Sequence, residues 1–218
     1  LLDKVNAWCK KRGAYASKKN KTAVHMNISV PTYKREKLDF VKLVLFMGDH
    51  QVLEQFDRLV VDPGQTNYAV SAFDLLEKKV KNNPYVARHV IDKIKNHMDL
   101  AANKALHTGA TSKFTSANVQ SNRVEFRGPG GNYLEQYSED PNKLLMPMMR
   151  FIVALDAACD PAKYSKEYQV KLYKFLDKAV NDNDLLSVFT SYAAGKGFDA
   201  AAFKGLLSFY NAKKELSV

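Results

Sequence analysis

Residues 23–30 read AVHMNISV, and this stretch decides the fold class. Apolar and polar side chains alternate along it, which is the pattern of a strand with one buried face. The polar side of the strand carries His25, Asn27 and Ser29. Pro31 ends the strand, because proline has no N–H to donate to a sheet. We therefore expect a strand that presents an imidazole and an amide on its polar face.

A second strand of the same character is predicted at residues 122–127, which read NRVEFR. Its apolar side chains point to one face, and Arg123, Glu125 and Arg127 point to the other. The apolar faces of both strands need cover, which helices can give. We expect the polar faces of the two strands to line one open concave surface.

Helical periodicity accounts for most of the remaining chain. The predicted helices cover residues 1–11, 35–57 with a break at Gly48-Asp49, 70–81, 85–106, 143–158 and, in three pieces, 164–215. Residues 107–121 read as a polar loop. The glycine-rich residues 128–131 either form a tight turn after the strand or approach a phosphate group with their backbone amides.

These elements predict an α+β fold. It has a mainly antiparallel sheet with a polar concave face, helices packed on the other face, and a C-terminal helical extension. The expected division is a domain over residues 1–160, whose N-terminal part lies outside this sequence, and the extension over residues 161–218. The chain starts without an initiator methionine, so we expect it to be a fragment of a longer gene product.

Composition narrows the class of protein. The 218 residues hold 12 Phe and 11 Tyr, which is typical of a folded chain rather than a disordered one. No apolar run reaches the roughly 18 residues of a membrane helix. The two cysteines, Cys9 and Cys159, do not make a disulfide framework, which favours a reducing, cytoplasmic location.

The net charge of +10 is concentrated near the N-terminus. A basic segment of this kind can bind nucleic acid, an acidic surface or an anionic ligand. No regular aromatic or Gly-Arg repeat accompanies the lysines, however, as it does in many nucleic-acid-binding segments. A solvated lysine-rich face is therefore the favoured interpretation, and nucleic-acid binding stays open.

The polar faces of the two strands offer metal and anion chemistry. His25 and Glu125 can share a divalent cation. Arg123 and Arg127 suit phosphate or carboxylate groups, because each guanidinium binds two oxygens at once. Together these groups would suit phosphoryl transfer. The structural alternative is a cross-strand ladder of ion pairs with no ligand.

Both strands resemble those of a known superfamily. Residues 21–30, KTAVHMNISV, resemble the His-x-His/Asn strand of the glutamine-synthetase-like carboxylate–amine ligases. Residues 123–129, RVEFRGP, resemble their Arg-x-Glu-x-Arg-x-Pro strand, and residues 116–118 are similar to a segment that precedes it in the amidoligase family. The resemblance covers about residues 1–158, with both motifs in the family's order.

The resemblance implies a ligase that phosphorylates a carboxylate with ATP and then forms an amide or isopeptide bond. Its implied metal ligands, for Mg²⁺ or Mn²⁺, are His25 and Glu125. The implied catalytic residues are Arg127, which would hold the carboxylate or its acyl-phosphate, together with Arg123 and Glu125. The implied nucleotide contacts are Asn27, Asn118, Arg58 and Arg123.

One feature of the family is missing from this sequence. The Gly-x-Glu-x-Glu strand that completes the metal site in the family is absent. Either it precedes Leu1 in the full gene product, or the protein has lost it. The first case predicts an enzyme whose partners are a small-molecule or peptide carboxylate and an amine donor. The second predicts a degenerate basic scaffold or nucleic-acid-associated protein. A homo-oligomer or larger assembly stays open in both cases.

Overall fold

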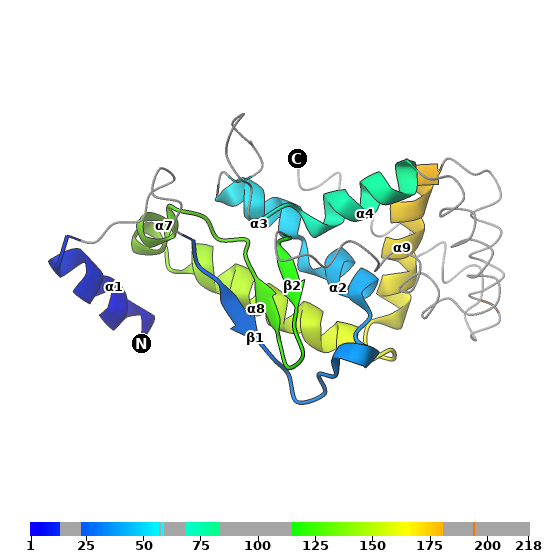
Figure 1. The fold of residues 1–218 in the computed structure, drawn as a ribbon, viewed down its shortest axis with the longest axis horizontal. Helices are drawn as coiled ribbons and strands as arrows, with labels where there is room; N and C mark the ends of the chain where they lie inside the picture. The colour runs from blue at the N-terminus through cyan, green and yellow to red at the C-terminus, as the bar shows by residue number, and fades with distance from the viewer. Residues whose placement is uncertain (14–22, 57, 59–68, 83–114, 181–193, 195–218) are drawn as a thin grey trace.

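The computed structural model describes residues 1–13, 23–56, 58, 69–82, 115–180 and 194. These residues form an α+β fold with a small antiparallel sheet (Figure 1). The strands are β1 (Met26–Ile28), β2 (Ala117–Val119) and β3 (Val124–Phe126). The helices are α1 (Leu2–Lys11), η1 (Arg35–Lys37), α2 (Phe40–Met47), α3 (Asp49–Gln55), α4 (Ala72–Lys81), α7 (Tyr133–Glu139), α8 (Asn142–Cys159) and α9 (Ser165–Val180).

The sheet has the strand order β1-β3-β2, and both pairs are antiparallel. Strands β2 and β3 form a hairpin, which is closed where the backbone N–H of Gln120 donates to the carbonyl of Arg123 at 2.9 Å. β1 comes from a part of the chain about a hundred residues earlier and pairs with the other edge of β3. The two predicted strands are therefore neighbours, with β3 in the centre of the sheet.

Two parts of the sequence prediction are wrong. Residues 117–119 form strand β2, although the polar segment 107–121 is predicted as a loop. This strand has only three residues, and it is defined by its pairing with β3 rather than by a hydrophobic pattern of its own. Residues 35–39 do not belong to the following α-helix: a 3₁₀ turn comes first, and Asp39 then caps α2 by accepting from the backbone N–H of Lys42 at 2.9 Å.

The predicted break at Gly48 is present and separates α2 from α3. Gly48 has a φ of 58°, in the left-handed region that glycine adopts without steric cost. The next helix of the described chain, α4, is capped by Ser71, whose hydroxyl accepts from the backbone N–H of Asp74 at 3.1 Å. These caps fix the helices that pack behind the sheet.

Helix α2 lies in the centre of the hydrophobic core. It contacts α8, α9 and α4, and most of its residues are buried. Its one lysine, Lys42, is buried too, and its Nζ donates to the carbonyls of Asp160 at 2.9 Å and Lys163 at 2.5 Å. The sheet joins this core through Phe126, which stacks on Phe151 of α8 with ring centroids 4.5 Å apart. The strands overlie α8 in Figure 1.

Helix α9, the first helix of the predicted extension, packs on α2 and α4. Its side chains Tyr168, Leu172 and Phe175 are buried in the same core as those of α2. The boundary at residues 160/161 is not tested by this packing and stays a prediction.

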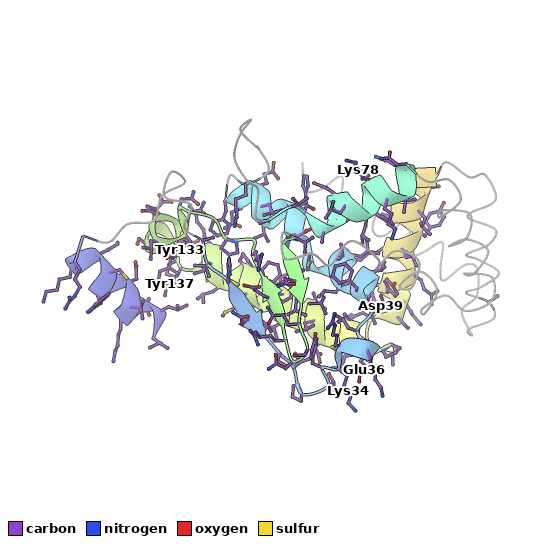
Figure 2. All side chains as sticks on the ribbon, in the orientation of Figure 1. Lys34, Glu36, Asp39, Lys78, Tyr133 and Tyr137 are labelled. Atoms are coloured by element: carbon purple, nitrogen blue, oxygen red, sulfur yellow. The ribbon has the colours of Figure 1, made fainter. Side chains whose placement is uncertain are left out.

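Helix α7 was not predicted, because residues 132–139 lack a clear apolar period. Its Tyr137, labelled in Figure 2, donates its hydroxyl to Asp3 of α1 at 2.8 Å. Asn6 of α1 also donates to Ser138 of α7, at 3.1 Å. These polar contacts link the two helices at one end of the molecule.

Some predictions lie outside the described residues. These are the helix at 85–106 and the last two of the three helices predicted within 164–215. In the part of the chain that the structure describes, none of the helices combines the length and hydropathy of a membrane span.

Candidate functional site

Three polar side chains occupy one register position across the sheet. Asn27 of β1 pairs with Glu125 of β3, which in turn pairs with Asn118 of β2. Cross-strand partners share a face of a sheet. The register therefore gathers one carboxyl group and two amides on a single face, opposite the face where Phe126 meets α8.

Glu125 is the centre of this group. Its Oε1 lies 2.6 Å from Nδ1 of His25. Its Oε2 accepts from Nη2 of Arg127 at 2.7 Å, from Nδ2 of Asn118 at 3.0 Å and from Nε2 of Gln120 at 3.4 Å. The side chain of Glu125 is only 11% exposed, whereas that of His25 is 45% exposed. A buried carboxylate thus meets a half-exposed imidazole at the surface of the sheet.

The surroundings of Glu125 favour its ionised form. Burial acts to raise the pKa of this carboxyl, but hydrogen bonds from Asn118 and Arg127, the positive charge of Arg127 and the nearby imidazole of His25 outweigh it. The net pKa of Glu125 lies below its ordinary value. The group is therefore a carboxylate at neutral pH, the form that a cation requires.

Arg127 lies at the end of β3, where a second arginine supports it. Nη1 of Arg58 donates to the carbonyls of Arg127 at 2.7 Å and Pro129 at 3.2 Å. Burial lowers the pKa of Arg58, and the positive charge of Arg127 lowers it further. Nε of Arg127 is buried and has no hydrogen-bond partner among the described residues. This end of the site therefore concentrates positive charge and leaves one buried donor unsatisfied.

The glycine-rich loop after β3 packs against the protein itself. A Cβ at Gly128 would lie 2.7 Å from Cγ1 of Val52, and one at Gly130 would lie 2.9 Å from the carbonyl oxygen of Phe56. Both positions thus require glycine for a close approach to the end of α3. For residues 128–131, this packing favours a tight turn after the strand over a loop whose backbone amides approach a phosphate group.

Arg123 forms a second group at the other end of β3. Its Nε donates to Oδ1 of Asn27 at 2.8 Å, and its Nη1 donates to Oδ1 of Asn122 at 2.9 Å. All seven predicted site residues therefore lie on or beside the sheet. His25, Asn118 and Arg127 each contact Glu125, Arg58 supports the backbone at Arg127, and Arg123 lies with Asn27.

Two residues of this site were missed in the sequence. Gln120 contacts Glu125, and Tyr33 donates its hydroxyl to the carbonyls of Gln120 at 2.6 Å and Arg123 at 3.2 Å. Tyr33 thus holds the hairpin end from which Arg123 projects. A period of two, continued from Asn118, would have placed Gln120 on the polar face. Nothing in the sequence around Tyr33 indicates its role.

A buried acid anchors the strand that supplies Asn118. Oδ2 of Asp49 accepts from the hydroxyl of Ser116 at 2.5 Å and from the backbone N–H of Ala72 at 2.6 Å. Burial raises the pKa of Asp49, although these hydrogen bonds partly offset the effect. The carbonyl of Ser116 in turn accepts from the backbone N–H of Arg127 at 2.8 Å. Asp49 therefore ties α3 and α4 to both ends of the hairpin.

The donor set suits part of a metal shell. His25 and Glu125 bring one nitrogen and one carboxylate together, and the described residues hold no group of three or more His, Cys, Asp or Glu side chains that could bind a metal. Mg²⁺ is commonly held by one or two carboxylates, with waters and substrate phosphates completing its shell, and Mn²⁺ accepts similar oxygen ligands. His25 and Glu125 are of ligand types that such a partial set uses, and in this structure they are in direct contact with each other.

Comparisons of this chain with protein-family models, curated proteins and solved structures find no match.

Proposed function

We propose that this chain carries the nucleotide and carboxylate site of an ATP- and divalent-metal-dependent carboxylate–amine ligase. The contact that supports this proposal most directly is the 2.6 Å approach of His25 to Glu125. These residues come from segments that are distant in the sequence. A polar sheet face with an imidazole, a carboxylate and guanidinium groups suits the chemistry of two anionic substrates.

Each group has a role in this proposal. His25 and Glu125 hold Mg²⁺ or Mn²⁺, which neutralises phosphate charge when bound. Arg127 holds the carboxylate substrate, using the donor that has no partner in the described structure. Arg123, Asn27 and Asn118 contact the nucleotide. Arg58 acts as a positioning residue, because it donates to the backbone at Arg127 rather than toward the open face.

The proposed reaction forms an amide in two steps. The γ-phosphoryl group passes from ATP to an oxygen of the carboxylate, and ADP leaves. The amine nitrogen then bonds to the carbonyl carbon, the bond from that carbon to the phosphate oxygen breaks, and the amine proton passes to solvent. Two arginines, Arg123 and Arg127, against one glutamate leave the face positively charged, which opposes the repulsion between ATP and the carboxylate.

The test is ADP release that depends on a carboxylate. The longest available gene product is incubated with Mg²⁺, ATP, hydroxylamine as the amine, and a panel of amino acids and peptides as carboxylates. We expect hydroxamate to form in step with ADP release, and Arg127→Ala to lower the rate by about 100-fold or more. Arg12→Ala, at the C-cap of α1, is the matched control and leaves the rate unchanged. ADP release that no carboxylate stimulates, or no ADP release at all, would contradict the proposal.

One observation favours a non-enzymatic scaffold instead. Both oxygens of Glu125 already have protein neighbours, as in a structural ion-pair ladder. A scaffold that associates with nucleic acid would bind it with an affinity that falls steeply with salt. That binding would not change in Glu125→Ala. A ligase would instead lose nucleotide binding in the same variant, so the two functions are distinguishable.

A further inference from the structure

Helix α8 exposes an apolar stripe on the side away from the sheet. Met146, Met149 and Val153 keep 64%, 51% and 46% of their surface exposed. Their spacing of three and four residues places them on one side of the helix. Phe151 of the same helix faces the opposite way, because it stacks on Phe126 of the sheet. The stripe therefore lies apart from the polar site.

The stripe borders a groove of about 460 Å³. Its other side is formed by the end of α2 and by α3, with Phe46, Val52 and Gln55 among the lining residues. Val52 is buried and Phe46 is half-buried, so the floor of the groove is apolar. The exposed stripe spans two helical turns, or about 10 Å. A groove between helices with this length and lining suits one face of a third helix.

The charge at the groove is positive. Arg150 is the one charged residue among the described residues that line it, and its Nη1 donates across to Oε1 of Gln51 at 2.8 Å. Lys171 of α9 lies nearby, with Nζ 5.4 Å from the centroid of the Phe46 ring. Burial lowers the pKa of Lys171, and the positive charges of Arg150 and Lys174 lower it further. An occupant with carboxylates beside its apolar face would complement the exposed guanidinium group of Arg150.

A second copy of this chain does not supply an acidic occupant from α8, whose own apolar stripe lies beside Arg150, or from α1. Leu1, Val5 and Trp8 of α1 are exposed, but the same short helix and its end carry Lys4, Lys10, Lys11 and Arg12. The whole chain also has a net charge of +10. Like charges would therefore oppose this docking.

We propose that the groove between α3 and α8 docks an acidic amphipathic helix of a partner protein. The partner places apolar side chains at helical spacing against Met146, Met149 and Val153, and carboxylates beside Arg150. Methionine suits such a surface, because its unbranched side chain adapts to the shape of the partner.

The test uses two matched fluorescent helical peptides of about 18 residues, stapled because short helices are marginal in water. Both carry leucine at positions i, i+3 and i+7. One carries glutamate beside this stripe, and the other carries lysine at the same positions. We expect fluorescence anisotropy to show that the acidic peptide binds the full chain at least about tenfold more tightly than the basic one. Met149→Glu should abolish the binding, and Arg150→Glu should reverse the preference.

Val5→Glu on α1 is the matched control, because it adds the same charge at an exposed apolar residue of another helix. It should leave the affinity unchanged, and equal melting temperatures would show that each variant is folded. Equal affinities for the two peptides, or no binding of the acidic peptide up to about 1 mM, would overturn the proposal. A dimer in sedimentation velocity that Met149→Glu dissociates would also overturn it, and would assign the groove to a second copy.

Discussion

At the scale of single residues, the candidate site depends on one buried carboxylate. Glu125 is held by donors from β2, by Arg127 on its own strand, and by His25 close to β1. A carboxylate with this many donors stays ionised even when it is mostly buried. It can also contribute to stability without any ligand, so its two roles need separate measurements.

The stabilising role of Glu125 predicts that the free energy of unfolding depends on pH. A carboxyl whose folded pKa is depressed stabilises the fold above its ordinary pKa of about 4, and this stability is lost as the pH falls through the folded value. Glu125→Gln should therefore have a lower free energy of unfolding than the parent chain at pH 7, and this free energy should fall less on acidification. Each difference is on the order of 1 kcal/mol. Urea unfolding between pH 7 and pH 3 measures both.

Glu139→Gln is the matched control for this prediction. Glu139 forms an exposed ion pair with Lys143, which contributes little to stability. Its replacement should leave the acid dependence unchanged. If Glu125→Gln, like the control Glu139→Gln, gave the same pH dependence of unfolding free energy as the parent chain, the depressed pKa of Glu125 would be refuted.

At the scale of elements, the loop after β3 packs closely on α3 because residue 128 is a glycine and has no side chain. Gly128 allows Val52 of α3 to approach, because a Cβ at this position would lie 2.7 Å from Cγ1 of Val52. Both residues are buried, so neither can move toward solvent at low cost.

This fit predicts opposite effects of one substitution in two backgrounds. Gly128→Ala should destabilise the parent chain by about 1–3 kcal/mol through overpacking. In a Val52→Ala background the same change should be neutral or stabilising, because the new methyl group occupies the space that Val52 has left. A double-mutant cycle from urea unfolding gives the coupling. Additive effects of the two substitutions would contradict this packing.

The elements that the sequence predicted are those with a strong hydrophobic period. The alternation in residues 23–30 and 122–127 gave the two strands, and Gly48 gave the break between helices. Strand β2 was missed because its three residues are set by pairing with β3, which is a contact between segments. Helix α7 was missed for a related reason, since it is short and is held by side-chain contacts with α1.

The same distinction applies to the site. Alternation alone placed His25, Glu125 and both arginines on polar faces, but it could not give the register that sets Asn27 and Asn118 on either side of Glu125. That register comes from the pairing of the strands, which depends on the whole sheet. The roles of these residues in ligand binding rest on their chemical types and on the resemblance, and they stay predictions.

At the scale of the whole molecule, one hydrophobic core supports two separate surfaces. The core joins α2, α8 and α9 behind the sheet, so that Phe126 and Phe151 fix the polar face on one side. The groove of α3 and α8 faces another way. The proposed catalytic face and the proposed docking face can therefore be changed independently, and Met149→Glu should leave the proposed ligase activity intact.

The most direct test of the proposed function is binding of Mn²⁺ together with a non-hydrolysable ATP analogue. Electron paramagnetic resonance of the longest available gene product should show bound Mn²⁺ that requires the analogue and is lost in His25→Ala and Glu125→Gln. His50→Ala is the matched control, because His50 pairs with Asp74 at 3.2 Å away from the sheet. It should bind as the parent chain does. No nucleotide-dependent Mn²⁺ binding, or binding that survives both site variants, would contradict the assignment of His25 and Glu125 as metal ligands.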